Sequence, residues 1–244
     1  MVTAGHRARL RATLLDKAAA DSQISAAAVT GSAAGNAEDD WSDIDLAFSV
    51  ADPDELQNVL AEWTAYMYRV HAALHHLDIT ASPWIYRVFL VPGTLQIDLA
   101  FVPSTDFRAL APTFRLIFGE AGAPQHESSP PRENLIGMGW LYALHARTSM
   151  ARNRLWQAEY MVSGLRDHAL ALACLRHGLP AVHARCIHLL PKELQAAFEQ
   201  TLVAQLTGPE IRRAFEAVID LFHGEIAEAN PTLAARLGES LRAL

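Results

Sequence analysis

Hydrophobic and polar positions follow two different periods in the first 103 residues. Apolar residues recur every three or four positions in 5–20 and again in 52–76, which predicts two amphipathic helices. Short apolar runs with strand-like composition predict four β-strands, at residues 24–31, 42–50, 84–91 and 95–102. Pro92, Gly93 and Thr94 stand between the last two runs and predict a tight hairpin turn.

The pattern changes after a stretch rich in Gly, Pro and Ser, residues 119–134, which reads as a linker or exposed loop. Only helical spacing follows it, and it predicts helices at residues 132–151, 153–177, 191–206, 208–228 and 230–243. We therefore expect an α+β protein. A small mixed α and β domain over residues 1–118 precedes an all-α helical bundle over residues 131–244.

Composition narrows the class of protein. The chain has 244 residues, of which 51% are hydrophobic and 19% charged, so it can bury a sizeable core and is not disordered. A net charge of -7 makes it a poor binder of polyanions, and we expect no nucleic-acid partner. The longest apolar run, residues 135–144, is too short to cross a bilayer, and the N-terminus reads as an amphipathic helix. We expect a cytoplasmic protein without a membrane partner, either a monomer or a homodimer.

Two aspartates stand inside an apolar strand. Side chains alternate between the faces of a strand, so Asp43 and Asp45 point the same way, while Ile44, Leu46 and Phe48 point into the core. Two carboxylates on one face repel each other unless a cation lies between them. Mg²⁺ prefers such oxygen ligands and often bridges protein and nucleotide phosphates.

The same reasoning applies to Asp98, which shares one face of its predicted strand with Gln96 and Ala100. Three acids at one sheet edge could hold two metal ions for in-line displacement at phosphorus. Gly31 and Ser32 add backbone N–H groups and a hydroxyl that could hold phosphate oxygens.

These residues resemble the signature of the DNA polymerase β-type nucleotidyltransferase superfamily. The matching stretch is Thr30-Gly31-Ser32, ten spacer residues, then Asp43-Ile44-Asp45-Leu46, with Asp98 as the later acid. Thr30 departs from the apolar residue that is usual there. The helical patterns of residues 152–179 and 189–194 are similar to the branch that modifies antibiotics, the aminoglycoside and lincosamide nucleotidyltransferases.

The resemblance implies a nucleotidyltransferase that uses Mg²⁺, with two ions, and ATP or another nucleoside triphosphate. It would move a nucleoside monophosphate, with AMP from ATP favoured, onto a hydroxyl of a small molecule such as an antibiotic, and release pyrophosphate. Gly31 and Ser32 would hold phosphates, and Asp43 and Asp45 would bind the metals. Asp98 would either complete the metal site or act as the base. The alternatives are a nucleotidyltransferase that acts on a protein hydroxyl and a nucleotide-binding module without turnover.

The helical half offers further candidates. Glu159 could bind an acceptor amine or act as a base, or it could form a surface salt bridge with Arg154 or Arg166. Arg147, Arg152 and Arg154 could contact the triphosphate or form a solvated basic face.

Several other polar and aromatic residues are interpreted as structural. Three histidines read as the end of the second helix rather than a zinc site: His71, His75 and His76. Three aromatic residues at helical spacing read as core rather than as stacking groups: Trp140, Tyr142 and Trp156. Asp39 and Asp40 read as solvated loop acids, and Cys174 and Cys186 as small core residues.

Overall fold

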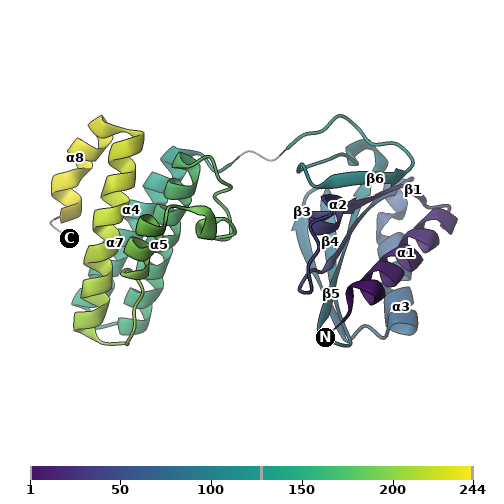
Figure 1. Ribbon diagram of the computed structural model, residues 1–244, viewed down its shortest axis with the longest axis horizontal. Helices are drawn as coiled ribbons and strands as arrows, with labels where there is room; N and C mark the ends of the chain where they lie inside the picture. Colours follow the sequence, from purple (N-terminus) through teal and green to yellow (C-terminus); the bar gives the residue numbers. More distant parts are fainter. Residues whose placement is uncertain (1, 127–128, 243–244) are drawn as a thin grey trace. The chain divides into compact units, whose positions relative to one another are not determined.

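The computed structural model describes residues 2–126 and 129–242 of the chain. The chain divides into two compact units, Met1–Glu127 and Ser128–Leu244, which we call the sheet unit and the helical unit (Figure 1). Among the described residues, the sheet unit contains a mixed sheet with flanking helices and the helical unit contains helices without strands, which confirms the predicted α+β class. The catalytic and acceptor-side roles expected for the two regions stay predictions.

The sheet unit is built on six strands in the order β3-β4-β5-β2-β1-β6. β2 and β5 run parallel, and the other neighbours are antiparallel. The strands are β1 (Ile24–Thr30), β2 (Ile44–Val50), β3 (His75–Ala81), β4 (Trp84–Val91), β5 (Leu95–Pro103) and β6 (Phe114–Phe118). The α-helices of this unit are α1 (Ala4–Ala20), the single-turn α2 (Gly31–Ala34) and α3 (Leu56–His71). Two short 3-10 turns are Pro53–Glu55 and Ser104–Asp106.

The larger core of this unit lies between the sheet and the two long helices α1 and α3, which Figure 1 shows on the same side of the sheet. Leu46 and Phe48 of β2 and Leu99 of β5 are buried there against Trp63 of α3. The opposite face carries a smaller cluster that includes Ala47 and Ala100 and is completed by larger residues, among them Trp84 and Phe107. The predicted alternation of the two central strands is therefore confirmed.

The hydrophobic pattern of the sequence did not predict β3 and β6, which are the two edge strands of the sheet. The predicted second helix ends at His71, where Ala72 adopts a left-handed conformation with a φ of 52°. His75 and His76 begin β3 instead, so their assignment to the helix end was wrong. The residues of β3 and β6 are mostly exposed, so neither strand has the alternating burial that makes a strand visible in a sequence.

The helical unit packs its long helices around one core. Its α-helices are α4 (Arg132–Ala151), α5 (Leu155–Arg176), α6 (Lys192–Glu199), α7 (Gly208–Ala229) and α8 (Pro231–Arg242), and a 3-10 turn spans Ile187–Leu189. Phe215 and Phe222 of α7 are buried with Val162 and Leu165 of α5. Helix α6 ends at Glu199, seven residues before its predicted end.

A paired charge joins two helices of this core. Glu225 of α7 is buried and accepts two hydrogen bonds from Arg176 of α5, from Nε at 2.8 Å and from a terminal nitrogen at 2.7 Å. Cys174 is buried as predicted, and Cys186 is partly buried. Burial raises the pKa of the Cys174 thiol, and the nearby Cys186 and Glu225 raise this pKa further. Within residues 2–126 and 129–242, every helix is too short or too polar to traverse a lipid bilayer.

Candidate metal and nucleotide site

The two central strands bring three aspartates together. Asp43 directly precedes β2, Asp45 lies on β2, and Asp98 lies on β5. Asp45 and Asp98 are register partners in the parallel β2–β5 pair, although they are 53 positions apart in the sequence. Each of the three carboxylates offers an oxygen atom, and these atoms lie within 4.8 Å of one another. We call these residues the acid cluster.

The strands hold the cluster on the face opposite α1 and α3. Ile44 and Ile97, which neighbour the aspartates in sequence, are fully buried in the larger core and fix the orientation of both strands. Because side chains alternate, Asp45 and Asp98 emerge on the other face, where Ala100 is the next residue of β5 on that side. The burial of the apolar residues thus decides where the carboxylates point.

Gly31 presses against the acid cluster from the end of β1. It has a φ of +62°, and a Cβ atom there would lie 2.0 Å from the Oδ2 atom of Asp45. Both the backbone angle and the space therefore require glycine. Ser32 follows in the single turn of α2, where its carbonyl accepts the N–H groups of Gly35 at 3.2 Å and Ala37 at 2.9 Å. Gly31, the first residue of the pair predicted to hold phosphates, thus lies against Asp45, one of the predicted metal ligands.

Asp98 has the most perturbed acidity in the acid cluster. Burial raises the pKa of its carboxyl to about 6, the amide of Gln96 lowers this pKa in part, and the negative charge of Asp43 raises it again. The Gln96 Nε2 atom donates to both oxygens of Asp98, at 3.0 and 3.2 Å. A half-buried carboxyl beside a second carboxylate is a position where a bound cation would be stabilised.

The residues present fit a divalent cation. All three carboxylates are half-buried, which leaves them accessible to an ion but poorly solvated. Neither Asp43 nor Asp98 forms an ion pair with a Lys, Arg or His side chain among the residues that the structure describes. Clustered oxygen ligands without a protein cation suit a hard ion such as Mg²⁺. The metal-binding roles of Asp43, Asp45 and Asp98 stay predictions.

Arg7 is a residue of this site that the sequence analysis missed. It is 2% exposed on α1, and its guanidinium donates to the carbonyl oxygens of Val2 at 3.0 Å and Asp40 at 3.1 Å, and to that of Asp39. It therefore holds the loop that leads into Asp43. The available signal was its spacing, since Arg7 shares the buried stripe of α1 with residues 10, 14 and 18.

The same loop carries Asp39 and Asp40, which are both exposed as expected. The carboxylate of Asp39 accepts hydrogen bonds from the Trp41 N–H at 2.9 Å and from the Ser42 hydroxyl at 3.0 Å. These two hydrogen bonds lower the pKa of Asp39. Asp39 is therefore a solvated loop acid that also stabilises the turn.

The candidates of the helical half lie in the helical unit. Arg147, Arg152 and Arg154 are exposed around the α4–α5 connection, where Arg152 ends α4 and Arg154 precedes α5. Glu159 accepts a hydrogen bond from Ser163 at 2.7 Å, and Arg166 donates to that same Ser163 oxygen at 3.0 Å. Ser163 thus links the glutamate to Arg166 without a direct ion pair, and the roles of these four residues stay predictions.

The three aromatic residues predicted to lie in the core of this unit differ in their exposure. Trp140 is 39% exposed and Trp156 is 78% exposed, so their assignment to the core was wrong. Tyr142 is partly buried, and its ring centroid lies 5.2 Å from that of His168. The amphipathic stripe of α4 and α5 is filled by small residues instead, among them Ala143 and Ala158.

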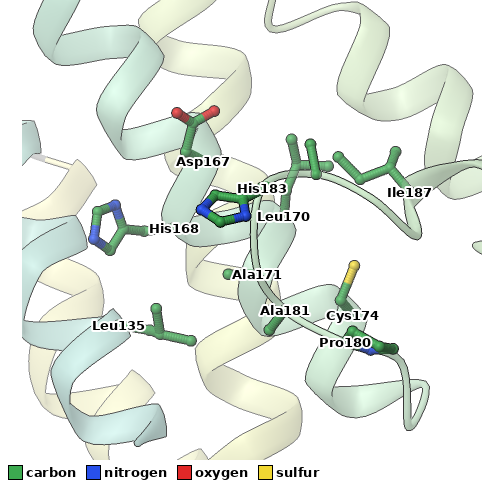
Figure 2. A pocket seen from close by; sticks show the side chains of 11 residues that line it. Leu135, Asp167, His168, Leu170, Ala171, Cys174, Pro180, Ala181, His183 and Ile187 are labelled. Carbon is green, nitrogen blue, oxygen red and sulfur yellow. The ribbon is translucent and has the colours of Figure 1, made fainter. Parts of the chain in front are cut away.

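The helical unit has a cavity of its own, with a volume of about 480 Å³ (Figure 2). Figure 2 shows the segment that carries Pro180 and His183 passing alongside α5, which contributes Asp167 and Cys174. This volume lies within the range of small-molecule sites. The cavity lies in the region predicted to contact the acceptor.

Comparisons with known proteins give remote structural similarity. Neither a sequence-family profile nor a curated protein matches the chain. An aminoglycoside 6-adenyltransferase from Bacillus subtilis has a similar structure, with a TM-score of 0.44, 11% identity, and coverage of 94% of this chain and 95% of that one.

Two further structures are similar over most of this chain. A nucleotidyltransferase-like protein from Exiguobacterium sibiricum 255-15 has a TM-score of 0.39 and 15% identity, over 95% of this chain and 79% of its own. The polymerase core of TRAMP, an RNA surveillance complex, has a TM-score of 0.34 and 13% identity, over 91% of this chain and 58% of its own. The chain is thus similar in structure, at low sequence identity, to proteins named as nucleotidyltransferases and to a polymerase core.

Proposed function

We propose that this protein is a metal-dependent nucleotidyltransferase that moves AMP from ATP onto a hydroxyl of a small molecule and releases pyrophosphate. The observation that carries the proposal is the contact between Gly31 and the acid cluster, where a Cβ atom would lie 2.0 Å from the Asp45 carboxylate. A phosphate-binding turn and a metal site that touch each other suit one substrate, a nucleoside triphosphate with its metal.

The residues then divide the work of the reaction. The backbone at Gly31 and the hydroxyl of Ser32 bind the terminal phosphates, because glycine allows the close approach. Asp43 and Asp45 hold the metal ions. When bound, Mg²⁺ supplies positive charge that offsets the charge developing on the transferred phosphoryl group.

Asp98 lies across the strand pair from Asp45. In this proposal it accepts the proton of the attacking hydroxyl. Gln96 orients this carboxylate through its two hydrogen bonds. General base catalysis of this kind contributes roughly 10²–10⁴-fold to the rate. In the alternative role, as a third metal ligand, Asp98 would affect metal affinity and turnover together.

The acceptor is expected to carry positive charge. The exposed or half-buried carboxylates at the site attract cations and repel anions, which favours an acceptor with amino groups, such as an aminoglycoside. The net charge of -7 acts in the same direction and disfavours nucleic acid as the acceptor. The helical unit, with Glu159 and its exposed arginines, would supply further acceptor and triphosphate contacts.

The test is transfer of label from α-³²P nucleoside triphosphates to a panel of aminoglycosides, lincosamides and proteins. We expect label on an amine-bearing small molecule, with ATP as the best donor and pyrophosphate as the second product. Asp43→Asn and Asp45→Asn should fold normally and lose transfer, because each removes a ligand charge but little volume. The matched control Asp54→Asn removes an exposed acid of the same unit and should keep full activity.

Each outcome has a defined meaning. A folded Asp43→Asn protein that transfers at the parent rate would refute the metal assignment. Label on a protein and on none of the small molecules would point to the protein-modifying alternative. Nucleotide binding without pyrophosphate release under any condition would favour a binding module.

A further inference from the structure

One tryptophan close in sequence to the acid cluster is almost fully exposed to solvent. Trp41 is 80% exposed, although tryptophan is a residue that folding normally covers on one face. It lies two positions before Asp43, in the loop whose carbonyl groups at Asp39 and Asp40 accept hydrogen bonds from Arg7. An exposed indole beside a candidate catalytic site suggests a surface that is covered only when a ligand binds.

The loop that presents Trp41 is constrained rather than free. Asp39 accepts the Trp41 N–H, and the Ser42 hydroxyl binds the Asp39 carboxylate and N–H group, at 2.9 to 3.0 Å. Buried Arg7 fixes the carbonyl of Asp40 at 3.1 Å. The indole is therefore displayed on a preorganised turn, which lowers the entropy that a ligand must overcome on binding.

A hollow of about 210 Å³ opens beside the indole. It lies between residues 40–43 and the hairpin residues 93–96, with Arg7 beneath, and we call it the Trp41 hollow. This volume is below the 300–1,000 Å³ typical of whole-ligand pockets. It suits one ring of a larger molecule rather than a complete nucleotide.

The position of the hollow decides which substrate it faces. Gly31 touches Asp45, so the phosphate side of the acid cluster is the side of Asp45. Asp43 and Gln96 line the hollow, and Gln96 binds Asp98 through both carboxylate oxygens. A ring in the hollow would therefore lie on the side of the proposed base, where the attacking hydroxyl has to be.

The acidic residues of the hollow indicate which functional groups that ring carries. The acidic residues that line the hollow are Asp40 and Asp43. Arg7 is the cationic residue among the described residues of the lining, and its guanidinium is buried and bound to carbonyl groups. An indole face beside carboxylates attracts an ammonium group by cation–π and ionic interaction.

We propose that Trp41 and the Trp41 hollow bind one ring of the acceptor, a saturated ring that bears amino and hydroxyl groups. The ring packs its apolar face on the indole, directs its amines to Asp40 and Asp43, and presents a hydroxyl toward Asp98. This assignment rests on the proposed nucleotidyltransferase function and names the acceptor-side subsite of the same centre. Trp41 is then a specificity-determining residue that contributes to acceptor affinity and not to nucleotide affinity.

The experiment records the indole N–H signals of uniformly ¹⁵N-labelled protein during titration with a cyclic diamine, 2-deoxystreptamine, with its di-N-acetyl derivative and with Mg-ATP. Trp41→Phe assigns the Trp41 signal, and Trp156→Phe assigns that of an equally exposed tryptophan in the helical unit. We expect the diamine to shift the Trp41 signal and leave the Trp156 signal in place. The neutral derivative should bind about 3- to 10-fold more weakly, since it lacks the charge.

Kinetics provide the second readout. Trp41→Ala should raise the KM for an amine-bearing acceptor about 3- to 10-fold and leave the KM for ATP unchanged, while Trp156→Ala should change neither. A Trp41 signal that responds to Mg-ATP and not to the diamine would overturn the proposal and make Trp41 a nucleobase platform. A signal that responds to neither would exclude a ligand role.

The result is separable from the proposed function. If the diamine shifts the Trp41 signal but no nucleotide is transferred, the subsite stands and the nucleotidyltransferase assignment fails. If transfer occurs and Trp41→Ala has the parent KM for every acceptor, the assignment stands and the subsite fails.

Discussion

Replacing Asp98 by asparagine should make the metal-free protein more stable at neutral pH while it abolishes or slows transfer. Burial is the main cause that raises the pKa of this carboxyl to about 6, against an ordinary value of 3.8. Between pH 3.8 and pH 6, the Asp98 carboxyl is therefore protonated in the folded protein and ionised in the unfolded chain. Stability contributed by this group is present below pH 3.8 and is lost as the pH rises through 6. Asparagine is uncharged throughout and escapes that loss.

The magnitude follows from the size of the displacement. The folded-state pKa lies roughly two pH units above the ordinary value, and one pH unit corresponds to 1.36 kcal/mol, so full desolvation would cost about 3 kcal/mol. The Asp98 side chain is only half-buried, and water that reaches it screens part of this cost. We therefore expect Asp98→Asn to gain about 1–2 kcal/mol at pH 7.5 and nothing at pH 4. The corresponding rise in Tm is about 3–8 °C for a unit of this size.

The assay is thermal and urea unfolding of the parent and Asp98→Asn at both pH values in the presence of a chelator. Trp63 is buried in the core of the sheet unit. With Trp140 and Trp156 of the helical unit replaced by phenylalanine in both proteins, tryptophan fluorescence reports on the sheet unit alone. Asp54→Asn serves as the control for loss of an exposed acid. Comparing the two pH values removes any constant effect of the altered hydrogen bond with Gln96. Addition of Mg²⁺ should stabilise the parent and reduce the advantage of the variant, because the ion offsets the clustered charge.

Two results would refute this reasoning. If the stability difference between parent and variant is the same at pH 4 and pH 7.5, the carboxyl has an ordinary pKa in the folded protein. If Asp98→Asn instead loses stability relative to the parent as the pH rises from 4 to 7.5, the carboxylate is stabilised in the folded protein and the sign of the argument is wrong.

Three further outcomes are expected. Gly31→Ala should weaken Mg-dependent nucleotide binding at least 10-fold by calorimetry, because the new Cβ atom meets the Asp45 carboxylate in a left-handed backbone; unchanged affinity would contradict the contact. Glu225→Ala should destabilise the helical unit by about 1–3 kcal/mol in urea unfolding, since it removes both hydrogen bonds that Arg176 donates to Glu225, whereas the control Glu216→Ala, at an exposed position of the same helix, should have little effect. Oligonucleotides should bind weakly at moderate salt in fluorescence anisotropy, and tight binding with a steep salt dependence would contradict the charge argument.

The sequence by itself determined the elements that have a buried face. The alternation around Ile44 and Leu46, and again around Ile97 and Leu99, identified both central strands and the faces that Asp45 and Asp98 occupy. The apolar stripes of the long helices likewise predicted α1, α4, α5 and α7 to within two residues at each end. Burial imposes a period on these segments, and a period can be read without knowing what lies across the core.

Tertiary structure alone decided what depends on distant segments. The edge strands β3 and β6 bury little, so no period marks them, and their pairing partners define them. The direct register of Asp45 with Asp98 comes from a parallel pairing that local pattern does not specify. Arg7 resembled any basic residue of a surface helix until folding buried its guanidinium against the carbonyl groups of the Asp39–Asp40 loop. The exposure of Trp41 is also decided by tertiary structure. A side chain is exposed when no other segment packs over it, and only the folded chain shows this.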